Sequence, residues 1–152
     1  MSLPAPATSA RALEPSDEHA WRRLFRDYGV FYETHFDDAV LTRVWRQLVD
    51  PGAGIHALVA EHGGEIVGIA HYRSHPDTFT GERDWFLDDL YVDPESRGNG
   101  AATALIEHLT ALARGVGGGT LRWITAETNE RAQRVYDRLA TRTSWVTYEV
   151  RL

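Results

Sequence analysis

Apolar residues recur at helical spacing in two segments of the first third of the chain. The first helix is predicted after Pro15-Ser16-Asp17, with one buried face made by Ala20, Trp21, Leu24, Phe25 and Tyr28. The second is predicted after Asp37-Asp38 and should end at Pro51-Gly52, with one face made by Val40, Leu41, Val44, Trp45 and Leu48. Gly29 should loosen or end the first helix.

Strand patterns dominate the middle of the chain. The runs Ile55–Glu61 and Glu65–Arg73 are separated by His62-Gly63-Gly64, which indicates a β-hairpin. After a polar loop, Ser74–Arg83, a third long strand is expected at Trp85–Val92. The remaining predicted elements are a strand at Arg11–Leu13, a helix at Ala101–Arg114, a strand at Leu121–Thr125, a helix at Glu130–Leu139 and a strand at Trp145–Leu152. This order predicts an α/β fold whose antiparallel half leads into a β-α-β half.

Length and composition narrow the classes of protein. The 152 residues fit one domain at 11–152, preceded by a short arm at 1–10. The absence of cysteine excludes a disulfide scaffold and a thiolate nucleophile, and it fits a reducing cytoplasm. The formal net charge of −6 argues against a nucleic-acid partner, and no apolar run approaches a membrane span. The seven histidines show no metal-binding spacing, so no metal is expected.

The segment from Leu87 to Leu105 contains the pattern with the most chemical information. A strand leads through a short turn into the loop Arg97–Gly100 and then into an amphipathic helix. Free N–H groups at such a helix start carry partial positive charge and suit a phosphate. A dinucleotide fingerprint would need a glycine where Thr103 stands, and a P-loop would need a lysine after the glycines. Taken alone, the pattern fits either an anion site or a glycine-containing turn.

Two motifs resemble those of the GNAT superfamily of N-acetyltransferases. Arg97-x-x-Gly100-x-Ala102, preceded by Leu-Tyr-Val-Asp-Pro, is similar to the first coenzyme motif, and Asn129-x-x-Ala132-x-x-x-Tyr136 to the second. Leu-Asp-Asp-Leu-Tyr-Val and Thr-Ala-Glu-Thr-Asn resemble the polyamine and histone-type branch. The resemblance is strongest over residues 87–139. It implies a mixed, mostly antiparallel sheet, splayed in the middle and flanked by helices, with acetyl-CoA as cosubstrate.

The same resemblance implies which residues meet the coenzyme. The strand residues Leu90, Tyr91 and Val92 would pair with the pantetheine arm, beside a β-bulge near Asp88-Asp89 that opens the slot. The pyrophosphate would be held by Arg97, Gly98, Asn99, Gly100, Ala101, Ala102 and Thr103. The second motif would add Asn129, Ala132 and Tyr136. Many relatives have Gly-Phe after the last helix, whereas this chain has Ala140–Trp145, so the final loop should differ.

Acetyl transfer to an amine requires a base, an oxyanion donor and an acid. Asp88, which matches the acidic position of the subfamily, is our candidate for the base, directly or through a water; it or Asp89 could instead only bind the substrate or be structural. A backbone N–H of Leu90–Val92 would stabilise the oxyanion. Tyr136 matches the general acid of the family, although an aromatic residue on an apolar helix face is often core.

The acceptor should be a small-molecule or peptide amine. Aromatic and carboxylate side chains suit an alkylammonium group, and the candidates are Tyr28, Phe31, Tyr32, Glu82, Asp84, Asp89 and Glu127. The resemblance also implies a homodimer formed through the C-terminal strand and final loop. Two other functions remain open: a non-catalytic acyl-CoA-binding module and a protein-interaction domain of the same fold.

Overall fold

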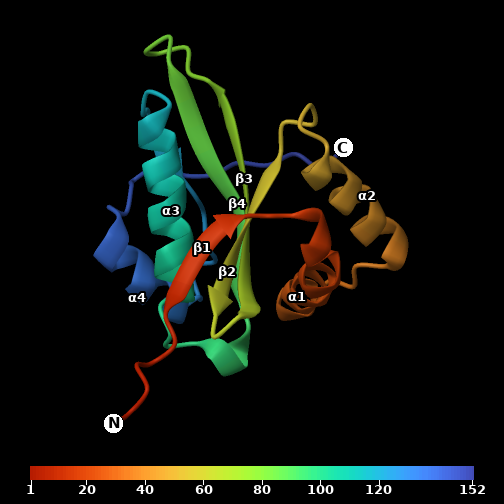
Figure 1. Cartoon of the computed structure of the whole chain (residues 1–152). Helices are drawn as coiled ribbons and strands as arrows, with labels where there is room; N and C mark the ends of the chain where they lie inside the picture. Colours follow the sequence, from red (N-terminus) through yellow and green to blue (C-terminus); the bar gives the residue numbers. More distant parts are fainter.

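The computed structural model describes all residues, 1–152, as two helical layers on opposite faces of one sheet (Figure 1). In chain order the elements are β1 (Thr8–Ala12), a 3-10 turn (Pro15–Asp17), α1 (Glu18–Phe31), α2 (Asp38–Val49), β2 (His56–His62), β3 (Glu65–Pro76), β4 (Arg83–Val92), a 3-10 turn (Pro94–Ser96), α3 (Ala101–Gly115), β5 (Leu121–Arg122) and α4 (Glu130–Leu139). Helices α3 and α4 cover one face of the sheet, and α1 and α2 cover the other (Figure 1).

The sheet follows the order of the chain, β1-β2-β3-β4-β5. The first three pairings are antiparallel and the last, between β4 and β5, is parallel. This arrangement confirms the mixed, mostly antiparallel sheet that the resemblance implied. The parallel pairing requires a crossover, and α3 provides it.

Each face of the sheet has its own apolar core. On one face α3 buries Leu105, Ile106 and Leu109 against the strands. On the other face Trp21 and Trp45, from α1 and α2, pack against the sheet. The predicted apolar stripes of the helices are therefore the buried ones, because a helix in a two-layer domain is stabilised mainly by burial of one face. No helix of the protein combines the length and the apolar composition that crossing a membrane requires.

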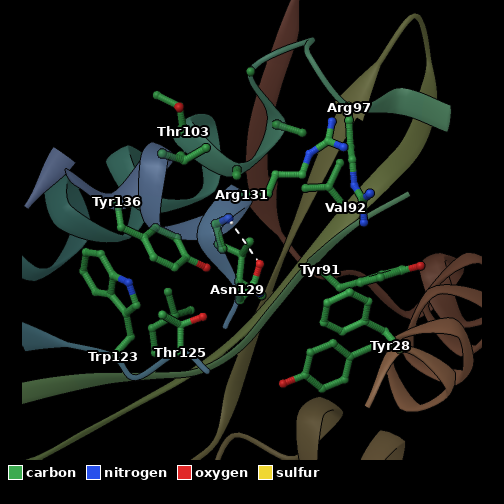
Figure 2. A pocket seen from close by; sticks show the side chains of 18 of the residues that line it. Tyr28, Tyr91, Val92, Arg97, Thr103, Trp123, Thr125, Asn129, Arg131 and Tyr136 are labelled. Atoms are coloured by element: carbon green, nitrogen blue, oxygen red, sulfur yellow. Dashed lines mark hydrogen bonds between the residues drawn. The ribbon is translucent and has the colours of Figure 1, made fainter. Parts of the chain in front are cut away.

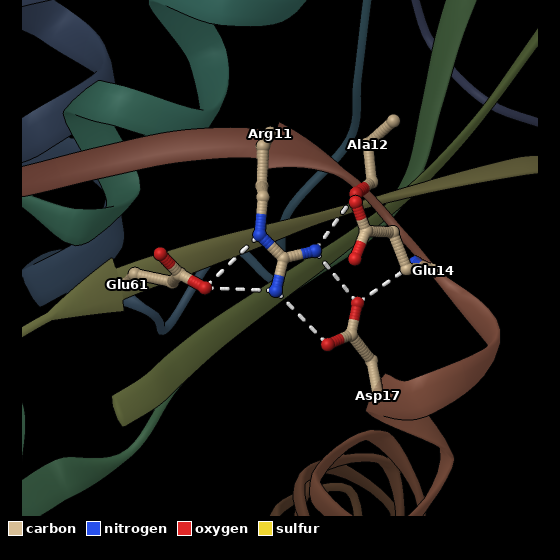
Figure 3. A network of polar contacts seen from close by, with 5 residues as sticks. All are labelled: Arg11, Ala12, Glu14, Asp17 and Glu61. Atoms are coloured by element: carbon tan, nitrogen blue, oxygen red, sulfur yellow. Dashed lines mark hydrogen bonds and ion pairs between the residues drawn. The ribbon is translucent and has the colours of Figure 1, made fainter. Parts of the chain in front are cut away.

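A partly buried ion-pair network fastens the N-terminal strand to the start of α1 (Figure 3). The guanidinium of Arg11 donates to both carboxylate oxygens of Asp17, at 2.8 and 2.9 Å, and to Glu61 of β2. Asp17 is only 4% exposed, and its carboxylate also accepts from the backbone N–H of Glu14. Hydrogen bonding to Arg11 lowers the pKa of Asp17. The network holds the start of α1 against β1 and β2. Because the helix is rigid, the position of its start also sets where its C-terminal end lies against the sheet.

Most predicted boundaries agree with the structure to within a few residues, but some elements differ. β1 begins at Thr8, so it includes the last three residues of the expected arm. Helix α1 continues through Gly29 to Phe31. β3 and β4 extend into the expected Ser74–Arg83 loop.

The predicted C-terminal strand is wrong for the single chain. Residues 140–152 form no strand and run as an extended segment that passes behind the strands in the view of Figure 1. Trp145, Tyr148 and Val150 are all more than 80% exposed. The alternation is present in the sequence, but a strand needs a partner edge to satisfy its backbone, and β5 offers only two paired residues. The predicted strand Leu121–Thr125 is accordingly limited to its first two residues.

Candidate active site

The site depends on how β4 and β5 separate. At one end they are held tightly: the backbone N–H of Trp85 donates to the Thr120 carbonyl at 2.8 Å, and the Asp84 carboxylate pairs with Arg122. The approach is so close that a Cβ on Gly119 would lie 1.8 Å from the carbonyl oxygen of Arg83. Pairing ends after Phe86 and Arg122, so the next stretch of β4 has a free backbone edge.

A β-bulge marks the point of separation. In the β3–β4 ladder His71 pairs with Asp89 and Tyr72 with Leu87, which leaves Asp88 as an extra residue. Such a residue bends the strand and strengthens its twist. The expected bulge is therefore present, and Asp88 is its centre. Past the bulge, Asp89 and Tyr91 face α1, while Leu90 and Val92 pack on the α3 side.

A cleft of about 520 Å³ occupies the space between the separated strands. Its walls come from the end of α1, the free edge of β4, the start of α3, the segment after β5, and α4. Figure 2 shows Tyr28 and Tyr91 on one side, with Asn129, Trp123 and Tyr136 on the other. The cleft brings together residues from both halves of the chain.

The start of α3 forms one end of this cleft. Gly98 and Gly100 have φ values of +87° and +77°, a left-handed conformation that glycine adopts without strain, and a Cβ on either would meet open space. Their backbone therefore lies open to a ligand beside the N–H groups of the first helical turn. Arg97, Arg131 and Arg138 add positive charge along the same cleft. An anionic group, such as a phosphate, suits this end.

Helix α4 supplies the opposite wall. The side chain of Asn129 caps the helix by accepting a hydrogen bond from the N–H of Ala132, at 3.3 Å. This cap directs the first turn of α4 toward the cleft, where Ala132 and Tyr136 line the wall. The Tyr136 ring lies edge-on to Trp123, with centroids 5.4 Å apart. Burial raises the pKa of Tyr136 to about 12, so its hydroxyl keeps its proton at neutral pH.

The two neighbouring carboxylates of β4 have different surroundings. Asp88 lines the cleft, and both of its oxygens lie 3.1 Å from the Arg73 Nε. Asp89 faces α1, and its two oxygens accept hydrogen bonds from Tyr28 of α1 and His71 of β3. Burial alone would raise the pKa of Asp89, but the hydrogen bonds from His71 and Tyr28 lower it.

The expected coenzyme residues converge on the cleft with one exception. Asn99 does not line it; its carbonyl oxygen accepts from the Thr8 hydroxyl, which ties the loop to β1. Every other residue expected to contact the coenzyme lines the cleft.

The expected acceptor residues are more scattered. Tyr28, Phe31 and Tyr32 line the cleft beside Asp88. Glu82 lies exposed near the tip of the β3–β4 hairpin, and Glu127 is exposed in the loop before α4. Asp84 is 5% exposed, and its pairing with Arg122 holds its pKa below the usual value. None of these three lines the cleft, and neither does Asp89, which was also an expected acceptor residue.

Sequence reasoning did not single out several residues that line the cleft. They are Ser96, Trp123, Ile124, Thr125, Arg131, Val135 and Arg138. The segment after β5 read as the second half of a strand, so nothing local showed that its side chains would face a cleft. Arg131 and Arg138 could have been found from their spacing, because on a helix capped by Asn129 they lie two turns apart on one side.

The cleft can therefore hold an extended molecule with an anionic end. The free edge of β4 offers backbone hydrogen bonds, the start of α3 offers an anion site, and Asp88 and Tyr136 offer a carboxylate and a protonated phenol. No three side chains of His, Cys, Asp or Glu are grouped as a metal site would require.

Comparison with known proteins identifies the family. The sequence model described as the acetyltransferase (GNAT) family matches residues 18–140. The chain is 32% identical over 141 residues to a D-amino-acid N-acetyltransferase of Saccharomyces cerevisiae, covering 91% of this chain and 88% of the relative. It is 34% identical over 92 residues to a thialysine N-epsilon-acetyltransferase of Bos taurus, covering 55% of this chain and 54% of that protein.

A solved N-acetyltransferase structure also has the fold of this chain. A ribosomal-protein-alanine N-acetyltransferase from Brucella melitensis biovar Abortus 2308 superposes with a TM-score of 0.80 at 25% identity, covering 96% of this chain and 99% of the other. The splayed sheet, the cleft and the sequence matches agree with one another. The chain belongs to the acetyltransferase (GNAT) family and is an N-acetyltransferase.

Proposed function

We propose that the cleft binds acetyl-CoA along the free edge of β4 and transfers its acetyl group to a primary amine that enters beside α1. The observation that carries the proposal is the position of the α3 N-terminus at the end of that free edge. Enzymes of this family use acetyl-CoA. The chain offers a matching surface for each part of an acyl-CoA: an edge for the amide-bearing pantetheine arm and an anion site for the diphosphate.

The residues that would hold the coenzyme follow from this arrangement. Leu90, Tyr91 and Val92 present backbone groups at the free edge, because β3 occupies only one side of the strand. The loop from Arg97 to Thr103 presents N–H groups at the start of α3, with the positive end of the helix dipole behind them. Ala132, on the first turn of α4, closes the cleft without filling it.

The chemistry would be direct attack of the amine in a ternary complex. Acetyl-CoA supplies the acetyl group as a thioester. Asp88 takes a proton from the attacking amine, directly or through a water, because an alkylamine with a pKa of about 10.4 arrives protonated at neutral pH. A backbone N–H at the free edge of β4 donates to the oxygen that gains negative charge. The bond to sulfur breaks, and Tyr136 gives its proton to the departing sulfur. The second proton that the nitrogen loses after attack returns to Tyr136 through water, so the products are the amide, the free thiol and the proton held by Asp88.

Burial makes Tyr136 a weak acid, with a pKa of about 12. Its proton passes to sulfur because the thiolate would be formed in the same desolvated environment, which raises the pKa of the thiol as well. The nearby rings of Trp123 and Tyr32 help to exclude water from this end of the cleft.

An acceptor screen tests the proposal directly. We expect purified protein with acetyl-CoA to release free thiol with at least one primary amine from a panel of D-amino acids, thialysine, polyamines and aminoglycosides. If carboxylates attract the acceptor, cationic amines should be preferred, and added salt should raise the apparent KM through screening over about 8–10 Å. Tight coenzyme binding in calorimetry without acetylation of any amine would support a non-catalytic module instead.

The coenzyme loop is tested by Gly100→Val. The new side chain would project into open space at the anion end of the cleft, so acetyl-CoA binding should weaken by about tenfold or more. Gly81→Val is the matched control, because Gly81 has a similar φ of +74° with open space around it but lies in the β3–β4 hairpin loop. Both variants place a valine at a similar left-handed φ, so their backbone strain is comparable. Equal coenzyme affinity in the two, measured by calorimetry, would contradict this assignment.

The acid role is tested by Tyr136→Phe. The change keeps the ring against Trp123 but removes the proton donor, so kcat should fall by roughly a hundredfold while the melting temperature and the coenzyme Kd stay near their original values. Tyr72→Phe serves as a control, because it deletes the hydroxyl of a buried tyrosine that does not line the cleft. A fully active Tyr136→Phe enzyme would leave Tyr136 with a packing role only.

We also propose that two copies associate through residues 145–152. Val146, Tyr148, Val150 and Leu152 alternate with polar residues and are all at least 75% exposed. An extended apolar segment of this kind is unfavourable in water unless a partner covers it. The free end of the sheet beyond β5 in a second copy offers a place for such a strand to pair.

Sedimentation velocity tests this association. The full chain should sediment as a dimer, and Val150→Asp on the apolar side of the segment should shift it toward monomer. Thr147→Asp introduces the same charge on the alternate side and should leave the dimer intact. A full chain that is monomeric at micromolar concentration would contradict the proposal.

A further inference from the structure

A chain of hydrogen bonds runs from the core between the sheet and α1 to the wall of the cleft. The indole Nε1 of Trp21 lies 2.8 Å from His71 Nε2, and His71 Nδ1 lies 2.9 Å from Asp89 Oδ2. The Tyr28 hydroxyl lies 2.8 Å from Asp89 Oδ1. Trp21 and His71 are buried, whereas Tyr28 lines the cleft. The roles derived for acetyl transfer do not use Trp21 or His71.

The direction of each hydrogen bond in this chain is determined. An indole N–H can only donate, so His71 Nε2 must be the acceptor and cannot carry a proton. In the neutral ring the proton then lies on Nδ1, which donates to Asp89. Trp21 therefore selects the tautomer of His71.

Asp89 receives donors on both oxygens. His71 occupies Oδ2, and the Tyr28 hydroxyl donates to Oδ1. The pKa of Asp89 is lowered, so it remains an acceptor at neutral pH. Burial and the nearby Asp89 charge raise the pKa of Tyr28, so its hydroxyl keeps its proton. The Tyr28 hydroxyl therefore donates its only proton to Asp89. Toward a ligand in the cleft, its oxygen can only accept a hydrogen bond.

We propose that Tyr28 Oη accepts a hydrogen bond from an N–H of the acceptor amine, and that Trp21, His71 and Asp89 are positioning residues that fix this polarity. The inference rests on the proposed function and adds a specificity-determining atom to it. Its effect is to favour acceptors that present hydrogen-bond donors and to hold the attacking nitrogen in a fixed orientation.

The location of Tyr28 supports this role. Its ring lies edge-on to Tyr32, with centroids 5.0 Å apart, and both rings line the cleft with Asp88. Tyr28 faces the cleft from α1, across from Tyr136 of α4 (Figure 2). An amine bound between these walls has Asp88 available to take a proton and Tyr28 Oη available to hold a second N–H.

The first test is Tyr28→Phe, which keeps the ring and removes the oxygen. With the best amine from the acceptor screen, we expect the amine KM to rise about tenfold or more, while the KM for acetyl-CoA stays the same. Tyr72→Phe is the control, since Tyr72 is adjacent to His71 but faces α3 and does not line the cleft. A network that only stabilises the fold would lower the melting temperature and leave the ratio of the two KM values unchanged.

The positioning chain is tested by Asp89→Asn and by its rescue. An amide has one acceptor and one donor group, so it cannot accept from both His71 and Tyr28. His71 cannot move its proton to Nε2 while Trp21 donates there, so the amide NH₂ must face Tyr28 and turn the Tyr28 proton into the cleft. The amine KM should then rise as in Tyr28→Phe.

Trp21→Phe in the Asp89→Asn background should reverse the defect. Without the indole N–H, His71 can carry its proton on Nε2 and accept from the amide, which frees the amide oxygen for Tyr28. The double variant should therefore recover a lower amine KM than Asp89→Asn alone, even though loss of core packing lowers its melting temperature. If the amine KM of the double variant is instead equal to or higher than that of Asp89→Asn, the positioning role of Trp21 and His71 is overturned.

The outcomes separate this inference from the proposed function. A protein that acetylates no amine refutes both. An active enzyme whose amine KM is unchanged by Tyr28→Phe refutes the inference alone. Long-range ¹H–¹⁵N spectra of the unmodified protein give an independent check that needs no variant: His71 should show a protonated Nδ1 and an unprotonated Nε2, and a proton on Nε2 would overturn the inference.

Discussion

The separation of β4 from β5 after Phe86 is the constraint on which the rest of the site depends. The two strands are joined at Trp85 and Phe86, where the Asp84–Arg122 pair and the close approach of Gly119 prevent them from separating. Two residues after that junction, the bulge at Asp88 turns β4 away. A continuous parallel pairing would use the backbone groups of both strands and leave no room between them. Because pairing stops early, the edge of β4 is free and a cleft exists.

The bulge has a second consequence, which concerns side-chain direction. Successive residues of a regular strand alternate between faces, so one extra residue reverses the alternation beyond it. Leu87 and Leu90 consequently face the α3 core, while Asp89 faces α1 and joins His71. Asp88 remains at the bulge and lines the cleft. Two adjacent carboxylates therefore have separate surroundings, one beside the cleft and one within a buried hydrogen-bond chain.

The two helical layers contribute different parts of the cleft. Helices α3 and α4 provide the anion end and the Tyr136 wall, and both pack on the same face of the sheet. Helix α1 approaches from the other face and brings Tyr28 and Tyr32 to the opposite end of the cleft. The Arg11–Asp17 network sets where α1 begins, so a feature far from the cleft contributes to the position of the tyrosines. Coenzyme and acceptor would thus be recognised by different layers, which meet only where β4 is free.

Local patterns in the sequence determined the helices, the hairpin strands and the coenzyme loop. The apolar stripes of α1, α2 and α3 match the buried faces, and the second motif lies at the start of α4, where Asn129 caps the helix. Those features depend on residues close together in the chain. The tertiary structure decided where side chains from distant segments meet: Asp84 lies with Arg122 rather than in the cleft, Glu82 lies near a hairpin tip, and Trp123–Thr125 line the cleft rather than extend the sheet. It also left the alternating segment 145–152 unpaired, because periodicity shows which residues share a face but pairing needs a partner edge that only the folded chain, or a second copy, can supply.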